Sequence, residues 1–254
     1  MNRFARLELL IGAAGLERLR RARVTVVGLG AVGSYVVEGL ARAGVGSLRL
    51  VDFDEVRPSN INRQLYALDS TLGRPKVTVA AARVADINPQ CTVEPLRLFV
   101  DARTAAAVLT PPPDVLVDAI DSLSPKVELI AAAHALGVRT ISVMGAALRT
   151  DPSLIRVADL AETRCCPLAR FVRKRLAKRG IHRGVLCVFS IEPIPKSSRS
   201  TAPSGEDEEP HVRGRRRWPL GSLSTLPGIF GLWAATEAIR MLTPLGENGR
   251  AASG

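Results

Sequence analysis

Three glycines and one aspartate have the spacing of a nucleotide-binding turn. Gly28, Gly30 and Gly33 stand in VVGLGAVGS, between an apolar β-branched run and a segment with helical spacing. This spacing permits a tight turn whose backbone N–H groups contact phosphate. Asp52 ends the next apolar run, where a carboxylate can accept hydrogen bonds from ribose hydroxyls. Up to this point a nicotinamide dehydrogenase fits as well as an ATP-binding enzyme.

A polar cluster after Asp52 favours ATP over a nicotinamide cofactor. VRPSNINRQ supplies Asn60, Arg63 and Gln64, and GRPK supplies Lys76. Arginine holds phosphate oxygens through two parallel hydrogen bonds, and lysine provides a mobile positive charge. Hydride transfer needs no such set, whereas it suits a triphosphate whose charge shifts during the reaction. The sequence therefore predicts that the nucleotide is consumed.

Two further carboxylates, Asp118 and Asp121, follow a later apolar run in VLVDAIDS. A carboxylate at this position can hold Mg²⁺ that bridges phosphate oxygens. The alternative is that Asp121 caps the amino terminus of the following helix. The phosphate-binding residues nearby make us favour the metal-binding role for Asp121.

Apolar runs alternate with helical segments along most of the chain. Strands are expected at residues 23–30, 47–54, 115–120 and 139–146, an extended segment at 91–100, and helices at 31–44, 76–88 and 125–136. Such alternation predicts an α/β, Rossmann-like fold with a doubly wound, mainly parallel sheet. The polar residues above then lie near the carboxyl ends of the strands.

The sequence changes character after about residue 150. We expect a nucleotide-binding domain over residues 1–150 and an extension over 151–254, with a basic helix in PLARFVRKRLAKRG, a disordered insert at 195–217 and a final packing helix within 226–239. The net charge of +11 indicates either phosphate-rich partners such as nucleotides, RNA or anionic membrane, or only a basic proteome or solubility. RNA contact by Arg173, Lys174, Arg175 and Lys178 is one interpretation of the basic helix, and a solvated face is the other.

Other features narrow the class of protein. The four cysteines form no Cys-x-x-Cys pair, so a structural zinc site of that kind is excluded. Cys187 lies in an apolar run and is interpreted as a buried strand cysteine, not a thioester nucleophile. His134, in an alanine-rich helix, is interpreted as structural. The first residues lack the apolar core of a signal peptide, and residues 226–239 are too short and interrupted to cross a bilayer. We expect a cytoplasmic protein without membrane insertion.

Several motifs together resemble one family. GLGAVGS, VDFDEVRPSNINRQ, GRPK and DAIDS, within residues 3–150, resemble the adenylation domain of the ThiF, MoeB and ubiquitin-activating superfamily. DAIDSLSPKVELI, VADLAETRCCPLARFVRKRL and GVLCVFSIE are similar to its tRNA threonylcarbamoyladenosine dehydratase (TcdA/CsdL) branch, and GIFGLWAATEAI resembles the last helix of the family.

The resemblance implies a role for each site residue. It implies that Asp52 holds the ribose and that Lys76 steadies the α-phosphate region, while Asp121 lies on the Mg²⁺ side. The nucleotide-binding set is completed by Gly28, Gly30, Gly33, Asp54, Asn60, Arg63 and Gln64. Arg6, in RFARL, matches an arginine that family members insert into the site of a partner subunit, which implies a homodimer. Arg63, Lys76, Asp121 and Arg6 are the catalytic candidates.

The implied reaction is the ATP- and Mg²⁺-dependent dehydration of threonylcarbamoyladenosine in tRNA through an acyl-adenylate. One alternative is adenylation of the carboxyl terminus of a ubiquitin-like sulfur carrier, and another is a non-catalytic nucleotide-binding scaffold. The missing Cys-x-x-Cys pairs and the basic segment favour tRNA. A sulfur-transfer protein is a further candidate partner.

Overall fold

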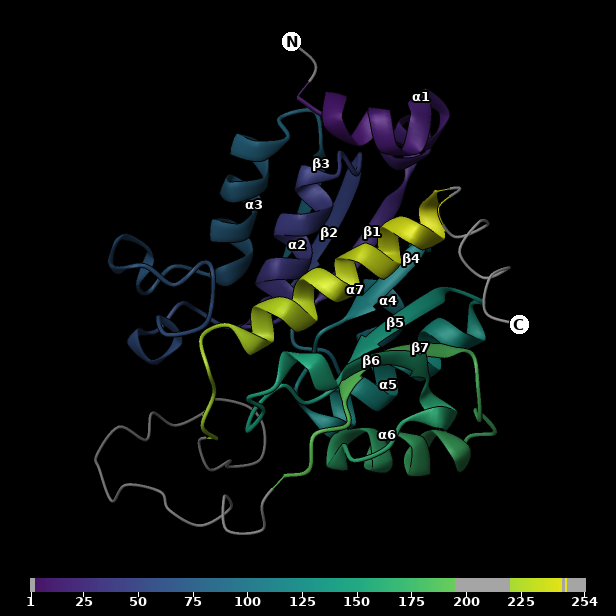
Figure 1. The fold of residues 1–254 in the computed structure, drawn as a ribbon. Helices are drawn as coiled ribbons and strands as arrows, with labels where there is room; N and C mark the ends of the chain where they lie inside the picture. Colours follow the sequence, from purple (N-terminus) through teal and green to yellow (C-terminus); the bar gives the residue numbers. More distant parts are fainter. Residues whose placement is uncertain (1–2, 195–219, 244, 246–254) are drawn as a thin grey trace.

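A seven-stranded sheet in the order β3-β2-β1-β4-β5-β7-β6 forms the centre of the computed structural model, which describes residues 3–194, 220–243 and 245 (Figure 1). Its strands are parallel except β6, which runs antiparallel to β7. The strands are β1 (Arg23–Val27), β2 (Ser47–Val51), β3 (Thr92–Leu96), β4 (Val115–Asp118), β5 (Arg139–Val143), β6 (Ile155–Asp159) and β7 (Val185–Ser190). The insert predicted at 195–217 lies outside the described residues.

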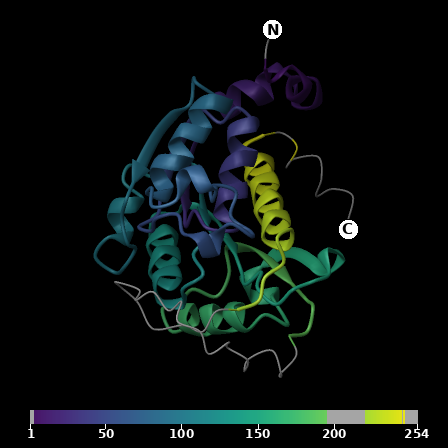
Figure 2. The same ribbon diagram turned by 90° about the vertical axis from the view of Figure 1, so that its left-hand side faces the viewer.

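Helices cover both faces of the sheet, so the predicted doubly wound fold is confirmed (Figures 1 and 2). Helices α2, α3 and α7 lie on one face, and α4, α5 and α6 pack on the other. The helices are α1 (Ala5–Arg21), α2 (Gly33–Arg42), α3 (Lys76–Ile87), α4 (Ala105–Val108), α5 (Leu123–Ala135), α6 (Pro167–Ala177) and α7 (Leu226–Leu242), with 3₁₀ turns η1 (Pro58–Asn60), η2 (Asp69–Thr71), η3 (Pro152–Leu154) and η4 (Leu160–Glu162).

Strands β2 and β3 lie on one side of β1, and β4 and the later strands lie on its other side, so the order of the strands reverses between β1 and β4. Strand β1 pairs with β2 on one side and with β4 on the other, in parallel register. Loops that leave two such neighbouring strands diverge, and they open a crevice at the carboxyl ends of the strands. Gly28 follows β1 and Ala119 follows β4, so the glycine turn and the segment that leads to Asp121 meet at this crevice.

Close backbone approach explains why α2 begins with glycine. A Cβ added to Gly33 would lie 1.7 Å from the carbonyl oxygen of Gly28, a distance that no side chain can occupy. Helix α2 can therefore begin directly against the end of β1, with its amino terminus at the crevice. At Gly39, further along α2, an added Cβ would lie 2.8 Å from Cβ of Ala235 in α7.

Helix α7 is the buried helix that the apolar stretch at 226–239 predicts. It packs on α2 and faces β4, β5 and β7, and the core cluster that includes Phe230 extends from Phe4 to Leu242. The proposed boundary near residue 150 stays a prediction, although the sheet continues across it through β6 and β7. In the part of the chain that the structure describes, no helix is both long and apolar enough to cross a bilayer.

Helices α1 and α4, strand β6 and the start of α5 differ from what the sequence indicates. Helix α1 is absent from the expected elements, and its helical pattern is interrupted at Gly12, which has a φ of +73°. Strand β6 is an antiparallel edge strand that is mostly half-buried. Helix α5 begins at Leu123, before the expected start at Pro125. Proline is tolerated in the first turn of a helix because the N–H that it lacks has no partner there.

Replacement of Phe230 by alanine should destabilise the fold by about 3 to 5 kcal/mol, because it leaves a cavity where a fully buried ring packs between α7 and the sheet. The matched control is Phe171→Ala, which makes the same chemical change at a ring that is 45% exposed on α6. Urea unfolding should show a much lower midpoint for Phe230→Ala and a small change for the control. Equal shifts would show that α7 contributes little to the core.

Candidate active site

The glycine turn lies between the ends of three strands. The N–H of Gly28 donates to the carbonyl of Val51 at 2.8 Å, and a Cβ added to Gly28 would lie 2.8 Å from the oxygen of Ala119. Gly28 also has a φ of +88°, which favours glycine. At Gly30, by contrast, an added Cβ would make only an ordinary contact with Nε2 of Gln64, at 3.7 Å. Packing therefore explains Gly28 but does not explain Gly30.

The carboxylate of Asp52 connects this turn to the end of β2. Its Oδ2 accepts a hydrogen bond from the N–H of Leu29 at 2.6 Å, and Oδ1 accepts one from the N–H of Asp54 at 2.8 Å. Burial raises the pKa of Asp52, while the positive charge of Lys76 and the two N–H donors act in the opposite direction. Nζ of Lys76 lies 3.2 Å from Oδ2 of Asp54. The structure thus brings Asp52, Asp54 and Lys76 together beside the glycine turn.

The loop at 57–64 adds the polar side chains that the sequence singles out. Asn60 is buried, and its Oδ1 accepts a hydrogen bond from the N–H of Arg57 at 3.2 Å. Nη1 of Arg63 donates to the carbonyl of Ser59 and to Oδ1 of Asn62, both at 2.8 Å. The side chain of Arg63 is held in place but is still partly exposed. It can therefore reach a ligand at the crevice.

The segment before α7 contacts this loop from far along the chain. Nδ2 of Asn62 donates to the carbonyl of Ser222 at 3.4 Å, and the N–H of Leu148 donates to the carbonyl of Gly221 at 2.9 Å. Residues 220–225 therefore connect the loop at 57–64 with the loop that follows β5. No pattern in the sequence identifies this contact of residues 220–225 with the two loops.

Asp121 is exposed at the end of the β4 loop. Helix α5 has Ser122 as its N-cap, so the helix-cap alternative for Asp121 is wrong. Within the described ranges, no group of three or more His, Cys, Asp or Glu side chains could hold a metal ion by itself. Magnesium is commonly bound by one or two carboxylates together with phosphate oxygens. The exposed carboxylate of Asp121 is compatible with a Mg²⁺ ion held in that manner.

Arg6 lies away from these residues. It is exposed on α1, and α1 leads into the amino end of β1, whereas the crevice lies at the carboxyl ends of the strands (Figure 1). Phe4, two residues earlier, contacts Gly44 beyond the carboxyl end of α2. A role for Arg6 in nucleotide chemistry therefore requires a second copy of the chain.

Lys126 is a site residue that the sequence analysis misses. Its Nζ, which is fully buried, lies 2.6 Å from Oδ2 of Asp118 and also donates to Oγ of Ser142 at 3.1 Å and to the carbonyl of Val143 at 2.9 Å. Oδ1 of Asp118 accepts a hydrogen bond from the N–H of Ile120 at 3.0 Å. This ion pair holds the turn that presents Asp121. The sequence signal for it is a lysine among the apolar residues of α5, shortly after an aspartate that ends an apolar strand.

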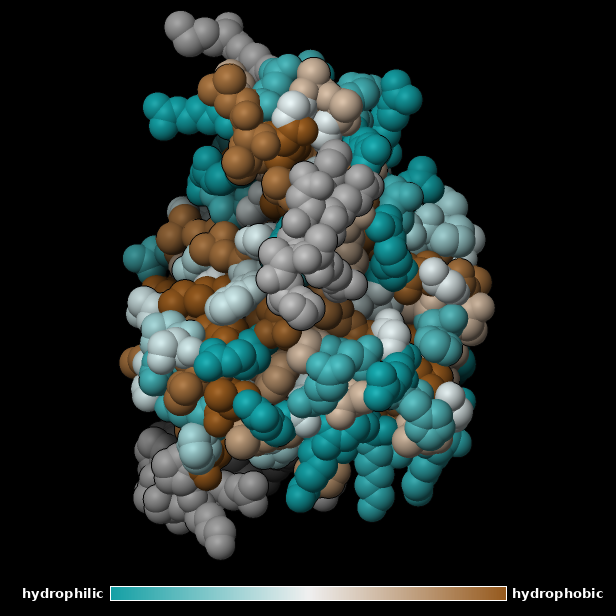
Figure 3. Space-filling view, turned by 45° about the vertical axis from the view of Figure 1, so that its right-hand side comes forward, coloured by the Kyte–Doolittle hydropathy of each residue, from teal (hydrophilic) through white to brown (hydrophobic). Residues whose placement is uncertain are grey.

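The basic helix α6 has two kinds of cation. Nη1 of Arg173 donates to the carbonyls of Leu160 and Thr163 and to Oγ1 of Thr163, at 2.6 to 3.2 Å. Nη1 of Arg173 is therefore engaged within the protein, and RNA contact by this helix stays a prediction. Arg175 donates to Oγ of Ser124 at 2.9 Å, while Lys174 and Lys178 are exposed. Figure 3 shows long hydrophilic side chains that project from the lower part of the molecule, where α6 lies.

Two other interpretations concern residues outside the crevice. Cys187 is fully buried in β7, and burial raises the pKa of its thiol. The buried strand interpretation of Cys187 is therefore confirmed, since a thiolate is strongly disfavoured there. His134 is exposed near the carboxyl end of α5, at the other end of that helix from Asp121.

A glycine turn at the switch point of a doubly wound sheet, with a buried carboxylate and positively charged side chains beside it, is typical of a nucleotide-binding enzyme of the ThiF class. The chain belongs to the ThiF family, which matches residues 2–252, and the family resemblance of the motifs is confirmed. It is similar to the tRNA threonylcarbamoyladenosine dehydratase of Bacillus subtilis, at 41% identity over 91% of each chain.

Solved structures agree with this comparison. The crystal structure of the Escherichia coli tRNA N6-threonylcarbamoyladenosine dehydratase, TcdA, in complex with ATP superposes with a TM-score of 0.82 at 33% identity and covers 97% of this chain and 96% of that chain. The complex of the same enzyme with AMP gives a TM-score of 0.83 at 32% identity and covers 98% and 96%.

Replacing Lys126 by methionine should destabilise the protein by about 3 to 5 kcal/mol, since it leaves the carboxylate of Asp118 buried without its counter-charge. The double variant Lys126→Met/Asp118→Asn removes both charges and should recover much of that stability. Denaturant unfolding of the two single variants and the double variant measures the coupling. Additive effects would show that the two side chains act independently.

Proposed function

We propose that this protein is an ATP-dependent dehydratase that cyclises threonylcarbamoyladenosine in tRNA. The observation that carries the proposal is the cluster of Asp52, Asp54 and Lys76 beside the glycine turn, at the crevice between β1 and β4. The names of the relatives support the same substrate. The lengths of these relatives also support this substrate, because the chain covers 91% and 93% of the two bacterial enzymes.

The site suits activation of a carboxylate at the α-phosphate of ATP. An oxygen of the threonyl carboxylate forms a bond to the α-phosphorus, and pyrophosphate leaves. The carbamoyl group of the same side chain then attacks the activated carbonyl carbon, AMP leaves, and the ring closes with a net loss of water. Backbone N–H groups of the glycine turn and the cations Arg63 and Lys76 stabilise the charge that moves onto the phosphates. Because the substrate carries its own nucleophile, the site needs no external one.

Magnesium is assigned to the same reaction. The carboxylate of Asp121 would hold the ion with phosphate oxygens, and the ion would supply charge neutralisation at the leaving pyrophosphate. Asp118 is unsuited to this role because both of its oxygens are already engaged by Lys126, Ser142 and Ile120.

We place the reaction in the cytoplasm. A sulfur-transfer protein stays a candidate partner, which co-purification can test.

We also propose that two copies of the chain form the working unit. Arg6 cannot serve its own crevice, and its helix carries Leu9 and Leu10, whose exposed fractions are 90% and 69%. Hydrophobic side chains gather in the upper part of the molecule, where α1 lies (Figure 3). An exposed apolar patch of this kind is typical of a protein interface. A second copy of the chain would cover α1 and receive Arg6 at its crevice.

The reaction can be tested with purified protein, ATP, Mg²⁺ and tRNA that contains threonylcarbamoyladenosine. We expect a nucleoside lighter by one water, together with AMP and pyrophosphate in equal amounts, measured by mass spectrometry after mild digestion. The same mixture without Mg²⁺ is the control and should give little product. Formation of ADP would indicate γ-phosphoryl transfer. Formation of AMP with an unchanged nucleoside would retain adenylation and exclude tRNA cyclisation.

Replacement of Arg63 or Lys76 by alanine should lower the rate of pyrophosphate release by about 10²- to 10³-fold, because each change removes a positive charge that acts on the phosphates in the transition state. Arg74→Ala is a matched control, because Arg74 is exposed near Lys76 and is not assigned to the site. Near-normal pyrophosphate release by the Arg63 and Lys76 variants would contradict their assignment.

The same assay tests whether the site is shared between subunits. Arg6→Ala and Lys76→Ala proteins should each be weakly active alone, and their mixture should regain activity because some mixed dimers contain one intact site. Subunit exchange can be followed with differently tagged proteins. Proven exchange without recovered activity would count against insertion of Arg6 into the site of a partner subunit.

A further inference from the structure

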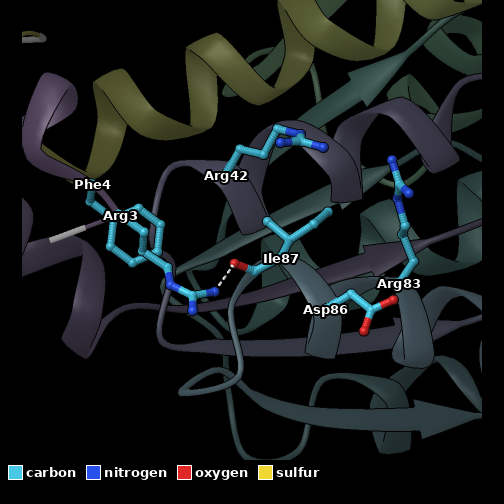
Figure 4. Close-up of a pocket in the computed structure, with 6 residues that line it drawn as sticks. All are labelled: Arg3, Phe4, Arg42, Arg83, Asp86 and Ile87. Carbon is cyan, nitrogen blue, oxygen red and sulfur yellow. Dashed lines mark hydrogen bonds between the residues drawn. The ribbon is translucent and has the colours of Figure 1, made fainter. Parts of the chain in front are cut away.

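A second hollow lies at the other end of α2, away from the nucleotide crevice. A pocket of about 390 Å³ is lined by Arg3, Phe4, Arg42, Arg83, Asp86 and Ile87 (Figure 4). A smaller pocket of about 170 Å³ is lined by Phe4, Arg20, Gly44, Gly46, Asn88 and Gln90. The two share Phe4, and we call them together the arginine groove. Gly33 and Arg42, at the two ends of α2, are about 14 Å apart at 1.5 Å per residue, so this groove is separate from the crevice.

The groove carries more positive charge than its acidic neighbours can balance. Arg42 and Arg83 both pair with the single carboxylate of Glu38, at 2.7 and 3.0 Å. Nη1 of Arg3 donates to the carbonyl of Ile87 at 2.6 Å, which is a neutral partner (Figure 4). Arg20 shares Glu17 with Arg21. Asp86 is the acidic residue that lines the groove.

The pairing also shows why these guanidinium groups are accessible to a ligand. Glu38 is mostly covered, with 12% of its side chain exposed, whereas the side chains of Arg42 and Arg83 are 59% and 44% exposed. The carboxylate thus orients the two arginines, while a large part of each side chain stays exposed to solvent. Arg20 is similarly accessible, with 45% of its side chain exposed. The arrangement presents fixed N–H donors to an anion.

We propose that the arginine groove binds phosphates of the RNA backbone of the substrate. Its lining offers guanidinium groups and the amide of Gln90, and these are the groups that hold phosphate and sugar oxygens without reading bases. Docking of a protein usually relies on an apolar anchor at the centre of the interface. The apolar ring shared by the two pockets, Phe4, is 7% exposed and packs on Gly44, so it offers no such anchor. The lining therefore favours a phosphodiester chain over an acidic protein.

This inference rests on the proposed function, and it explains how a distant groove can serve the reaction. Arg3 precedes Arg6 by three residues, which places the two within about 10 Å even for an extended chain. In the proposed dimer, Arg6 reaches the crevice of the partner subunit. The arginine groove of one subunit then borders the crevice of the other and holds the tRNA whose modified base enters there.

The test uses tRNA binding as a function of salt concentration, measured by fluorescence anisotropy with full-length protein. Arg3→Gln/Arg20→Gln should weaken binding and reduce the magnitude of the salt slope by about 0.7 to 0.9 for each RNA phosphate that the variant no longer neutralises. The control Arg103→Gln/Arg240→Gln removes the same charge outside the groove and should keep the wild-type slope. Asp86→Asn removes the acidic side chain of the lining and should tighten binding, a gain that misfolding cannot produce.

The outcomes separate this proposal from the proposed function. If wild-type protein forms the cyclic nucleoside but the groove variant keeps the wild-type slope, the groove proposal fails and the function stands. If wild-type protein forms AMP and never changes the nucleoside, the proposed dehydratase function fails, whatever the salt slope of the groove variant is. A groove variant that binds tRNA normally but loses affinity for a labelled poly-glutamate peptide would assign the groove to an acidic protein and overturn the proposal.

Discussion

One buried carboxylate, that of Asp52, holds the nucleotide crevice together. Each of its oxygens accepts a backbone N–H, one from Leu29 in the glycine turn and one from Asp54 after β2. Asp54 in turn pairs with Lys76, the first residue of α3. The glycine turn and Lys76 are therefore positioned through the same side chain. Burial of a charged group is costly, and the two N–H donors with the nearby ammonium group offset that cost.

Much of the fold, together with the glycine turn and Asp52 of the crevice, could be predicted from the sequence, because the signals for these parts are local. Parallel strands buried on both faces appear as short apolar runs, and the glycine spacing lies on the same strand–helix–strand unit as Asp52. Helix α1 has a weaker signal because Gly12 divides it, and β6 has little because an edge strand that is mostly half-buried lacks a strict apolar pattern. The basic pattern of α6 likewise does not show that the guanidinium group of Arg173 donates to Thr163.

The remaining parts of the crevice depend on contacts between distant residues. The pair of Asp118 with Lys126 forms only when β4, α5 and β5 have packed, because Ser142 and Val143 complete the surroundings of the ammonium group. The contact of Asn62 with Ser222 spans 160 residues of chain. Arg6 is a third case, since the fold of one chain leaves it near the amino end of β1, away from the crevice at the carboxyl ends of the strands. In each case the residue type is visible in the sequence and its partner is not.

The position of α7 has a consequence for how the protein is made. Its buried face, which includes Phe230 and Ala234, shares one core cluster with residues as early as Phe4. A ribosome produces the sheet strands and α2 well before it reaches this helix. The nascent chain must therefore hold an uncovered apolar face until residue 242 has been synthesised. The apolar core of this protein is thus completed only after α7 has been made.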